Sequence, residues 1–197
     1  MTKTLYLMRH GQTLFNKRHR IQGWCDAPLT DLGVYQAQVA GQYFKNAGIT
    51  FDAAYSSTSE RACDTLEIVT NGSLPYQRVK GLKEWNFGTF EGESEDLNPP
   101  LPYEDFFVTY GGESQDQVRE RMAATILQLM QETKGKSVLM VSHGGAMANF
   151  ARAWEGNWRL DNLGHMTNCG ILKFSFEADQ FYLEEAIGHD FSGWEEK

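Results

Sequence analysis

Five side chains in this sequence have the chemistry needed to move a phosphoryl group. His10 and His143 each precede a glycine, and a neutral imidazole in such a turn can attack phosphorus or bind a phosphoryl oxygen. Arg9 and Arg61 carry guanidinium groups, which neutralise phosphoryl oxygens through paired hydrogen bonds. Glu84 is a carboxylic acid that can protonate a leaving alkoxide. Together these residues predict phosphoryl transfer through a phosphohistidine.

Short apolar segments predict the strands that would position these residues. Residues 5–8, 51–55 and 138–141 are mainly apolar runs bounded by polar or turn-forming residues, a pattern typical of short buried strands. The first of these runs ends just before His10, and the third ends just before His143. Both histidines are therefore predicted to stand beyond the end of a strand.

Capping signals predict helices between these strands. Thr30 is predicted to cap a helix that ends at Gly48. The inward stripe of that helix is predicted to consist of Tyr35, Val39 and Tyr43, which recur at a spacing of four residues.

Two further helices have the signature of a capping box. Residues 57–60 have this form, which places Arg61 in the first turn of a helix that starts directly after a strand. Ser114 and Gln117 form a second box before a helix predicted to end near Gly135. The residues of this helix predicted to face inward are Val118, Met122, Ile126 and Leu129.

The alternation of strands and helices predicts an α/β layered domain with a mainly parallel central sheet flanked by helices. Residues 171–176 and 181–183 add two late strands joined by a polar turn. We expect a single domain over residues 1–197, with residues 93–112 as a cap-like connection. Ligands of such sheets gather beyond the carboxyl ends of the strands, and both histidines and Arg61 are predicted to meet there.

The overall composition disfavours several classes of function. The 197-residue chain has a formal net charge of -8, which disfavours nonspecific binding of nucleic acids or of anionic membranes. No apolar segment reaches the length of a membrane span, so we expect a cytoplasmic protein with reduced cysteines. His19, His165 and His189 belong to no paired motif and are expected at the surface or in packing. Formation of a homo-oligomer is left open.

Several sequence blocks resemble the histidine phosphatase superfamily, which includes the phosphoglycerate mutases. The blocks occur in the family's order over most of the chain, and their combination is more specific than any one block alone. They comprise Leu5 to Thr13 with Asn16, Gly23 to Gly33, Ser56-Ser57 followed by Arg61-Ala62 and Thr65, Leu82 to Gly88 followed by Phe90 to Gly92, and Ser142 to Gly145. The resemblance implies a phosphoglycerate mutase-like fold.

The resemblance also implies a role for each of the five residues. His10 would accept the phosphoryl group, while Arg9, Arg61 and His143 would hold its oxygens. Glu84 would protonate the leaving oxygen and then deprotonate the attacking water. No metal and no other cofactor is implied, since the arginines supply the positive charge. The expected partner is a small phosphorylated substrate.

Further substrate or phosphate contacts are expected around these five residues. The additional candidates are Asn16, the amide of Gly144, Gln22, Trp24 and Asn168. Glu91 lies seven residues after Glu84 in the same irregular segment and is the alternative acid.

Residues 93–112 favour hydrolysis over mutase chemistry. A mutase retains a doubly phosphorylated intermediate and needs cations beyond the first phosphate site, but this connection contains no Lys or Arg. We therefore expect a phosphatase that acts on a small phosphomonoester. The basic residues 17–20 and the block at 23–33 are mutase-like, so a cofactor-dependent phosphoglycerate mutase remains the alternative. A non-catalytic module that binds a phosphorylated ligand is the third candidate.

Overall fold

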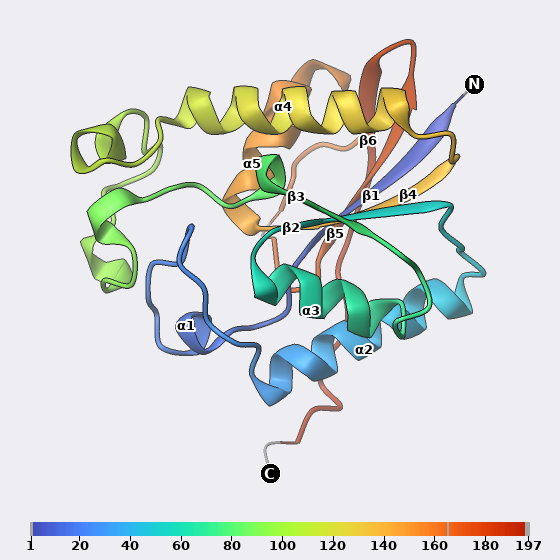
Figure 1. Cartoon of the computed structure of the whole chain (residues 1–197), viewed down its shortest axis with the longest axis horizontal. Coiled ribbons are helices and arrows are strands. Elements are labelled where there is room, and N and C mark those ends of the chain that lie inside the picture. Colours follow the sequence, from blue (N-terminus) through green and yellow to red (C-terminus); the bar gives the residue numbers. More distant parts are fainter. Residues whose placement is uncertain (1, 165, 196–197) are drawn as a thin grey trace.

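The computed structural model describes residues 2–164 and 166–195, and within them one six-stranded sheet carries helices on both faces (Figure 1). Across the sheet the strands follow the order β3-β2-β4-β1-β5-β6. The strands are β1 (Lys3–Arg9), β2 (Ala53–Ser57), β3 (Gln77–Val79), β4 (Ser137–Ser142), β5 (Ile171–Glu177) and β6 (Gln180–Ile187).

The sheet is mainly parallel. β1 pairs with β4, β4 with β2, and β2 with β3 in parallel, whereas β5 and β6 add an antiparallel edge beside β1. The predicted α/β class is therefore confirmed. Ala178 and Asp179 adopt positive φ angles of 50° and 60°, which close the β5–β6 hairpin at the predicted turn. β3 was not predicted, because it is three residues long and Gln77 and Arg78 are exposed.

Helices cover both faces of the sheet. Figure 1 shows α2 and α3 over one face and α4 and α5 over the other. The α-helices of the described chain are α1 (Leu14–Lys17), α2 (Asp31–Asn46), α3 (Glu60–Val69), α4 (Gln115–Glu132) and α5 (Gly144–Ala153). Short 3-10 helices are η1 (Lys80–Leu82), η2 (Gly88–Phe90), η3 (Glu95–Leu97), η4 (Phe106–Tyr110) and η5 (Glu155–Asn157).

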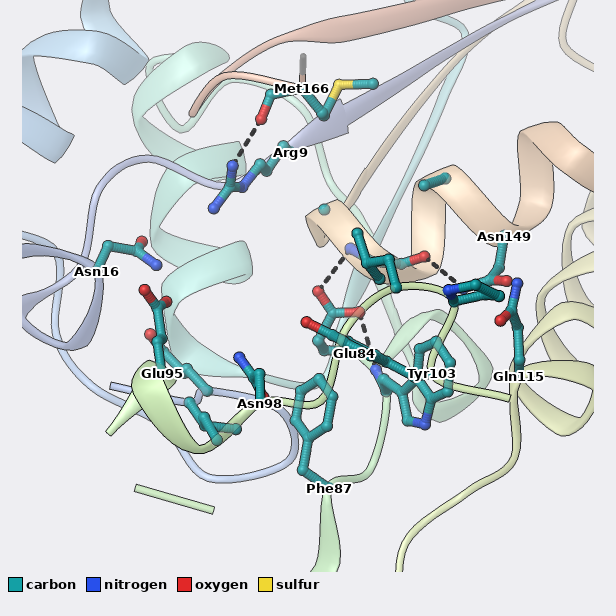
Figure 2. A pocket seen from close by; sticks show the side chains of 18 of the residues that line it. Arg9, Asn16, Glu84, Phe87, Glu95, Asn98, Tyr103, Gln115, Asn149 and Met166 are labelled. Atoms are coloured by element: carbon teal, nitrogen blue, oxygen red, sulfur yellow. Dashed lines mark hydrogen bonds between the residues drawn. The ribbon is translucent and has the colours of Figure 1, made fainter. Parts of the chain in front are cut away.

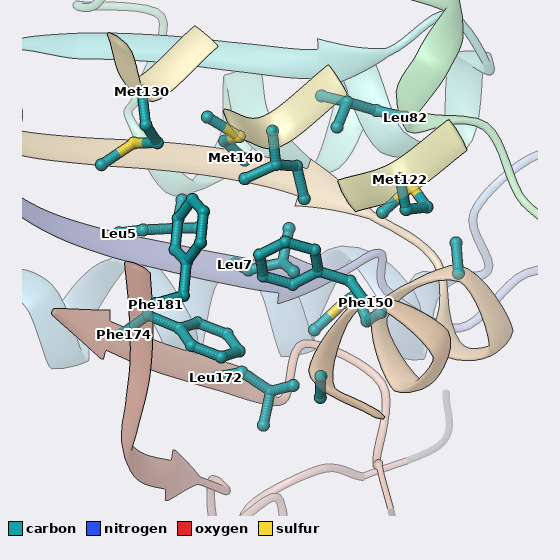
Figure 3. Close-up of a cluster of buried hydrophobic side chains, with 14 of the residues drawn as sticks. Leu5, Leu7, Leu82, Met122, Met130, Met140, Phe150, Leu172, Phe174 and Phe181 are labelled. Carbon is teal, nitrogen blue, oxygen red and sulfur yellow. The ribbon is translucent and has the colours of Figure 1, made fainter. Parts of the chain in front are cut away.

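Alternate side chains of the central strands enter two separate cores. Leu5 and Leu7 of β1 pack on the side of α4 and α5, where they join a cluster that includes Phe150 (Figure 3). Tyr6 and Met8 point to the opposite face and pack with α2 and α3. Burial on both faces explains why β1 appears in the sequence as a continuous apolar run.

The inward face of α2 differs from the prediction. The Thr30 hydroxyl accepts a hydrogen bond from the amide three residues on, and Gly48 follows the helix with a φ of 65°, as expected for its two ends. The predicted stripe of Tyr35, Val39 and Tyr43 is only half-buried. The buried residues of α2 are Gly33, Gln36, Ala37, Ala40 and Phe44. Small residues let the helix approach the sheet closely, and the two tyrosines of the predicted stripe lie at the rim of this contact.

The capping box predicted at residues 57–60 is wrong. α3 begins behind Ser59, whose side chain makes no capping hydrogen bond. Ser57 is instead the last residue of β2, and its hydroxyl contacts His143. Arg61 nevertheless lies in the first turn of α3, as predicted.

The capping box of α4 is confirmed, with the Ser114 and Gln117 side chains each bonded to the other's backbone. The last buried position of this helix is Met130, whereas the predicted Leu129 is half-buried. The sequence pattern predicts neither α1, which is a single turn, nor α5, which begins with two glycines.

No helix within the described residues combines the length and the apolarity that a bilayer crossing requires. The cytoplasmic location, and the lack of nucleic-acid and membrane partners, stay predictions. The thiols of Cys25, Cys63 and Cys169 are all free, and the last two are buried.

Candidate active site

Three segments that are far apart in the sequence meet at the carboxyl ends of β1, β2 and β4. His10 directly follows β1, His143 directly follows β4, and Arg61 lies in the helix that follows β2. The ring centres of the two histidines are 5.2 Å apart, and Arg61 Nε lies 3.3 Å from His10 Nε2. The structure thus brings these three residues together, as the strand-end argument requires.

The His10 ring is held as a neutral imidazole. Its Nδ1 lies 2.7 Å from the carbonyl oxygen of Gly11, and because a carbonyl can only accept, Nδ1 carries the proton. Arg61 Nε donates to the lone pair on Nε2. Burial, together with the charges of Arg61 and Arg9, lowers the pKa of His10 well below its usual value. The ring therefore has the protonation state that a nucleophile at Nε2 requires.

Arg61 is fully buried, and its guanidinium group is held on several sides. Nη1 donates to the carbonyl of Cys25 and to Asp26 Oδ1, both at 2.8 Å, and Nη2 donates to the carbonyl of Gly23 at 2.7 Å. Nε is the nitrogen that faces His10. These contacts fix a positive charge beside the atom that would receive a phosphoryl group.

Arg9 and the first turn of α5 form a second group of donors. Arg9 Nη1 donates to the carbonyl of Met166 at 2.6 Å, as Figure 2 shows. A Cβ placed on Gly144 would lie 3.3 Å from Arg9 Nε, and no acceptor in the described part of the chain contacts the Gly144 amide. Asn16 accepts from the Thr13 amide through Oδ1 at 3.1 Å, and its amide nitrogen points toward the cavity (Figure 2). A helix N-terminus beside a guanidinium group attracts an oxyanion.

The Glu84 carboxyl group is seated on the start of α5. Oε1 accepts hydrogen bonds from the amides of Trp85 at 2.9 Å and Ala146 at 2.7 Å, and Oε2 accepts from the amide of Gly145 at 2.9 Å. A Cβ on Gly145 would lie 2.9 Å from Oε1, so a side chain at this position would displace the carboxyl group. Glu84 is only 7% exposed. Its carboxyl group is thus oriented by three backbone donors.

His143 has one ring nitrogen bound and one without a partner. Nε2 lies 2.8 Å from the Ser57 hydroxyl, whereas the buried Nδ1 has no partner within the described residues. Burial, with the charges of Arg61 and Arg9, lowers the pKa of His143 well below its usual value. When the hydroxyl donates to Nε2, the proton of the neutral ring is on Nδ1.

A cavity of about 630 Å³ opens over this arrangement. Its lining includes six predicted site residues, namely Arg9, His10, Asn16, Gln22, Glu84 and Gly144. Another part of the wall comes from the connection over residues 93–112 and consists of Glu95, Asn98, Leu101, Pro102 and Tyr103 (Figure 2). Arg61 and His143 are fully buried and do not line the cavity.

Trp24 does not line the cavity, in contrast to the expectation that it contacts the substrate. Its indole Nε1 donates to the backbone carbonyl of Glu84 at 3.0 Å. The ammonium groups of Lys80 and Lys83 lie 5.1 Å and 4.8 Å from the centre of the ring. The indole thus supports the backbone that carries Glu84.

Gln22 lines the cavity, but its side-chain amide is bound to protein groups. It contacts the Thr13 hydroxyl, and with its oxygen turned toward Arg61 that oxygen lies 3.3 Å from Nη1. Asn168 donates from Nδ2 to the backbone carbonyl of His10 at 3.1 Å. Gln22 therefore lies in the cavity wall while it contacts Thr13, whereas Asn168 holds the backbone of His10.

Glu91 lies outside the cavity lining, and its carboxylate accepts hydrogen bonds from four backbone amides. This geometry favours Glu84 as the acid. Arg121 of α4, which the sequence did not single out, donates to the backbone carbonyl of Glu84 at 3.1 Å. Arg121 stands among other polar residues of the helix, so nothing in the sequence indicates this contact.

The remaining histidines lie away from this cluster. His19 is largely exposed and lies 3.5 Å from Glu95 Oε2. His189 packs against Tyr43, with ring centres 5.3 Å apart. The surface and packing roles expected for these two are confirmed, and His165 lies outside the described residues.

Comparison with known proteins gives one consistent family. The chain matches the histidine phosphatase superfamily (branch 1) over residues 5–187. The 2,3-bisphosphoglycerate-dependent phosphoglycerate mutase of Brucella anthropi is 32% identical over 203 aligned positions, which cover 95% of this chain and 98% of the mutase.

Solved structures agree. A phosphoglycerate mutase from Bacillus anthracis superposes with a TM-score of 0.81 at 28% identity, covering 93% of this chain and 92% of that one. A phosphoserine phosphatase from Entamoeba histolytica, in complex with 3-phosphoglyceric acid, gives a TM-score of 0.75 at 27% identity, covering 95% and 98%. With this fold, this meeting of His10, Arg61 and His143, and these matches, the chain belongs to the histidine phosphatase superfamily.

Proposed function

We propose that this protein is a phosphatase that hydrolyses a small phosphomonoester through a phosphohistidine on His10. The observation that carries the proposal is a buried, neutral imidazole whose Nε2 lies 3.3 Å from the Arg61 guanidinium group. Arg9, the Gly144 amide and the Asn16 side chain line the same cavity and supply further donors for phosphoryl oxygens.

The reaction would proceed in two steps, with a proton transfer at Glu84 in each. His10 Nε2 attacks phosphorus, the N–P bond forms as the P–O bond breaks, and the protonated Glu84 carboxyl group gives its proton to the leaving oxygen. Water then attacks phosphorus, Glu84 takes up a proton from that water, and the N–P bond breaks. The products are the alcohol, inorganic phosphate and the free imidazole. Arg9 and Arg61 balance the charge of the phosphoryl oxygens throughout.

A phosphoglycerate mutase is the second candidate, because proteins with that name are among the similar sequences and structures. Arg20 and Arg152 also line the cavity and are cations that a mutase could use. The wall formed by residues 93–112 contains no Lys or Arg, and it places the Glu95 carboxylate in the cavity lining (Figure 2). A negative charge at this place opposes a second phosphate group, which favours hydrolysis.

The first test is metal-independent turnover. The purified protein is expected to hydrolyse p-nitrophenyl phosphate, and EDTA should leave the rate within about twofold of its untreated value, because guanidinium groups supply the charge. Release of nitrophenolate before and after dialysis against EDTA measures this. A complete loss that Mg²⁺ or Zn²⁺ restores would contradict the proposed mechanism. No turnover under any condition would favour the non-catalytic binding module.

The second test separates hydrolysis from transfer. With 3-phosphoglycerate and a trace of 2,3-bisphosphoglycerate, inorganic phosphate should appear at least about tenfold faster than 2-phosphoglycerate. Phosphorus NMR resolves the three species in one sample. If 2-phosphoglycerate forms faster than inorganic phosphate is released, the protein is a mutase and not a phosphatase. In Glu95→Gln, inhibition by 2,3-bisphosphoglycerate should strengthen by about tenfold relative to inhibition by inorganic phosphate, because the opposing charge is removed.

A further inference from the structure

The Glu91 carboxylate binds a turn of backbone outside the cavity. Oε1 accepts from the amides of Trp24 at 2.7 Å and Phe87 at 3.1 Å. Oε2 accepts from the amides of Gly23 and Cys25, both at 3.0 Å. Four amide donors on one carboxylate fill both of its oxygens, so the group is committed to holding this backbone.

The opposite side of the same turn holds Arg61. The carbonyls of Gly23 and Cys25 accept from its guanidinium group at 2.7 Å and 2.8 Å, and Asp26 Oδ1 accepts at 2.8 Å. Residues 23–25 therefore lie between a carboxylate on their amide side and a guanidinium group on their carbonyl side. The remaining guanidinium nitrogen, Nε, is the one that faces His10 Nε2.

A second carboxylate holds the segment that carries the acid. Glu113 accepts from Arg121 Nε and Nη2, both at 2.8 Å, and from the amide of Asn86 at 2.9 Å. The Arg121 guanidinium group in turn donates to three backbone carbonyls of residues 81–84, at 2.8 to 3.1 Å. Glu84 is the last residue of that segment. The paired side chains are well shielded, with 16% of Glu113 and 19% of Arg121 exposed.

From these contacts we infer that Glu91 and Glu113 are positioning residues for two separable halves of the reaction. Glu91 holds the turn that sets Arg61 against the nucleophile, and Glu113 with Arg121 holds the backbone that sets the acid Glu84. Neither carboxylate lines the cavity, so each acts through another residue. The inference rests on the proposed function, because it assigns each carboxylate to one step of that reaction.

Loss of the Glu91 contacts has a specific consequence for pH dependence. The charged and titratable groups around His10 are Arg9, Arg61, His143 and Glu84. Burial lowers the His10 pKa, and the positive charges of Arg61 and Arg9 lower it further. When Arg61 is no longer held against Nε2, the His10 pKa rises toward its usual value. The neutral, nucleophilic form exists above that pKa, so the acid limb of kcat/KM moves to higher pH.

Glu91→Gln tests this half, because an amide nitrogen cannot accept the hydrogen bonds that a carboxylate oxygen accepts. We expect the acid limb of kcat/KM to move up by about one pH unit and kcat to fall by about tenfold to a hundredfold. The ratio of alkyl to aryl phosphate hydrolysis should stay unchanged. Glu93→Gln is the matched control, since it removes the same charge from an exposed carboxylate two residues away and should leave the limb in place.

Glu113→Gln tests the other half with the opposite signature. The kcat/KM for an alkyl phosphate should fall about tenfold more than that for p-nitrophenyl phosphate, because a misplaced acid matters most for a poor leaving group. The acid limb should stay at the wild-type pH. Arg121→Lys should reproduce the effect, since an ammonium group cannot bridge three carbonyls and a carboxylate as a guanidinium group does.

Circular dichroism and a thermal melt identify the folded variants for these measurements. If Glu91→Gln does not fold, Glu91→Asp keeps the charge on a shorter side chain and should show a smaller shift of the same limb. The inference would be overturned if the folded variants lose kcat equally on every substrate, while the acid limb of kcat/KM and the ratio of alkyl to aryl phosphate hydrolysis stay unchanged. Both carboxylates would then have only a structural role. Turnover by His10→Ala would instead overturn the proposed function.

Discussion

Replacement of His10 by alanine is expected to abolish phosphate release, with kcat at least about 10,000-fold below that of the wild type. The substitution removes Nε2, which lies 3.3 Å from Arg61 Nε and is the atom that would bond to phosphorus. The variant should also fail to form a phosphoprotein. Brief incubation with labelled substrate and a quench without acid should trap an acid-labile, base-stable phosphate on the wild type alone.

The matched control is His19→Ala. This substitution removes an exposed imidazole that contacts Glu95 at the cavity wall but none of the groups around His10, so turnover and trapping should both persist. Hydrolysis by His10→Ala at a rate comparable to the wild type would rule out the phosphohistidine mechanism.

Glu84→Gln should produce the second large effect, and its size should depend on the leaving group. An alkoxide needs a proton as it leaves, whereas a nitrophenolate barely does. We expect kcat/KM for alkyl phosphates to fall by about a thousandfold and that for p-nitrophenyl phosphate by less than about tenfold. With the aryl ester, phosphohistidine should accumulate above the wild-type level, because the variant also lacks the base that activates water. Quantified trapping at steady state measures this.

Glu91→Gln decides between the two carboxylates of this segment. Glu91 lies outside the cavity and is bound by four amides, so its variant should keep the wild-type ratio of alkyl to aryl hydrolysis. A leaving-group effect in Glu91→Gln, without one in Glu84→Gln, would identify Glu91 as the acid.

The meeting of His10, Arg61 and His143 could be predicted from the sequence because it depends on a general rule. Each follows an apolar run that is buried on both faces of the sheet, and parallel neighbours bring their carboxyl ends to one edge. β1 and β4 pair residue for residue up to Arg9 and Ser142, so the two histidines that follow these strands leave the sheet at the same edge.

Other features could not be predicted, because long-range contacts compete with local signals. Ser57 has the local pattern of a helix cap, yet its hydroxyl contacts His143, 86 residues away in the sequence. Trp24 has the residue type of a substrate contact, yet its indole supports the Glu84 backbone. Neither contact can be predicted from spacing or composition, because both depend on how irregular loops pack.

The choice between Glu84 and Glu91 shows the same limit. Both are carboxylates in a segment without helical or strand periodicity, so the sequence offers no rule for which one points inward. The structure separates them by their donors: Glu84 rests on the first turn of α5 within the cavity, whereas Glu91 rests on residues 23–25 outside it. The family resemblance already favoured Glu84, and the hydrogen bonds supply the physical reason.

Two different parts of the structure form the cavity, namely the strand ends and an irregular segment. This division makes it feasible to exchange the segment alone. The end proposed to bind the phosphoryl group is assembled at the strand ends, whereas the wall over residues 95–103 belongs to an irregular segment anchored by Phe107. That ring packs edge-on against Phe87 at 4.8 Å and Phe90 at 5.5 Å. A transplanted segment that keeps this anchor can therefore present a new surface to the leaving group while the reacting groups stay in place. We therefore expect exchange of this segment to change which phosphate esters are hydrolysed, separately from the chemistry.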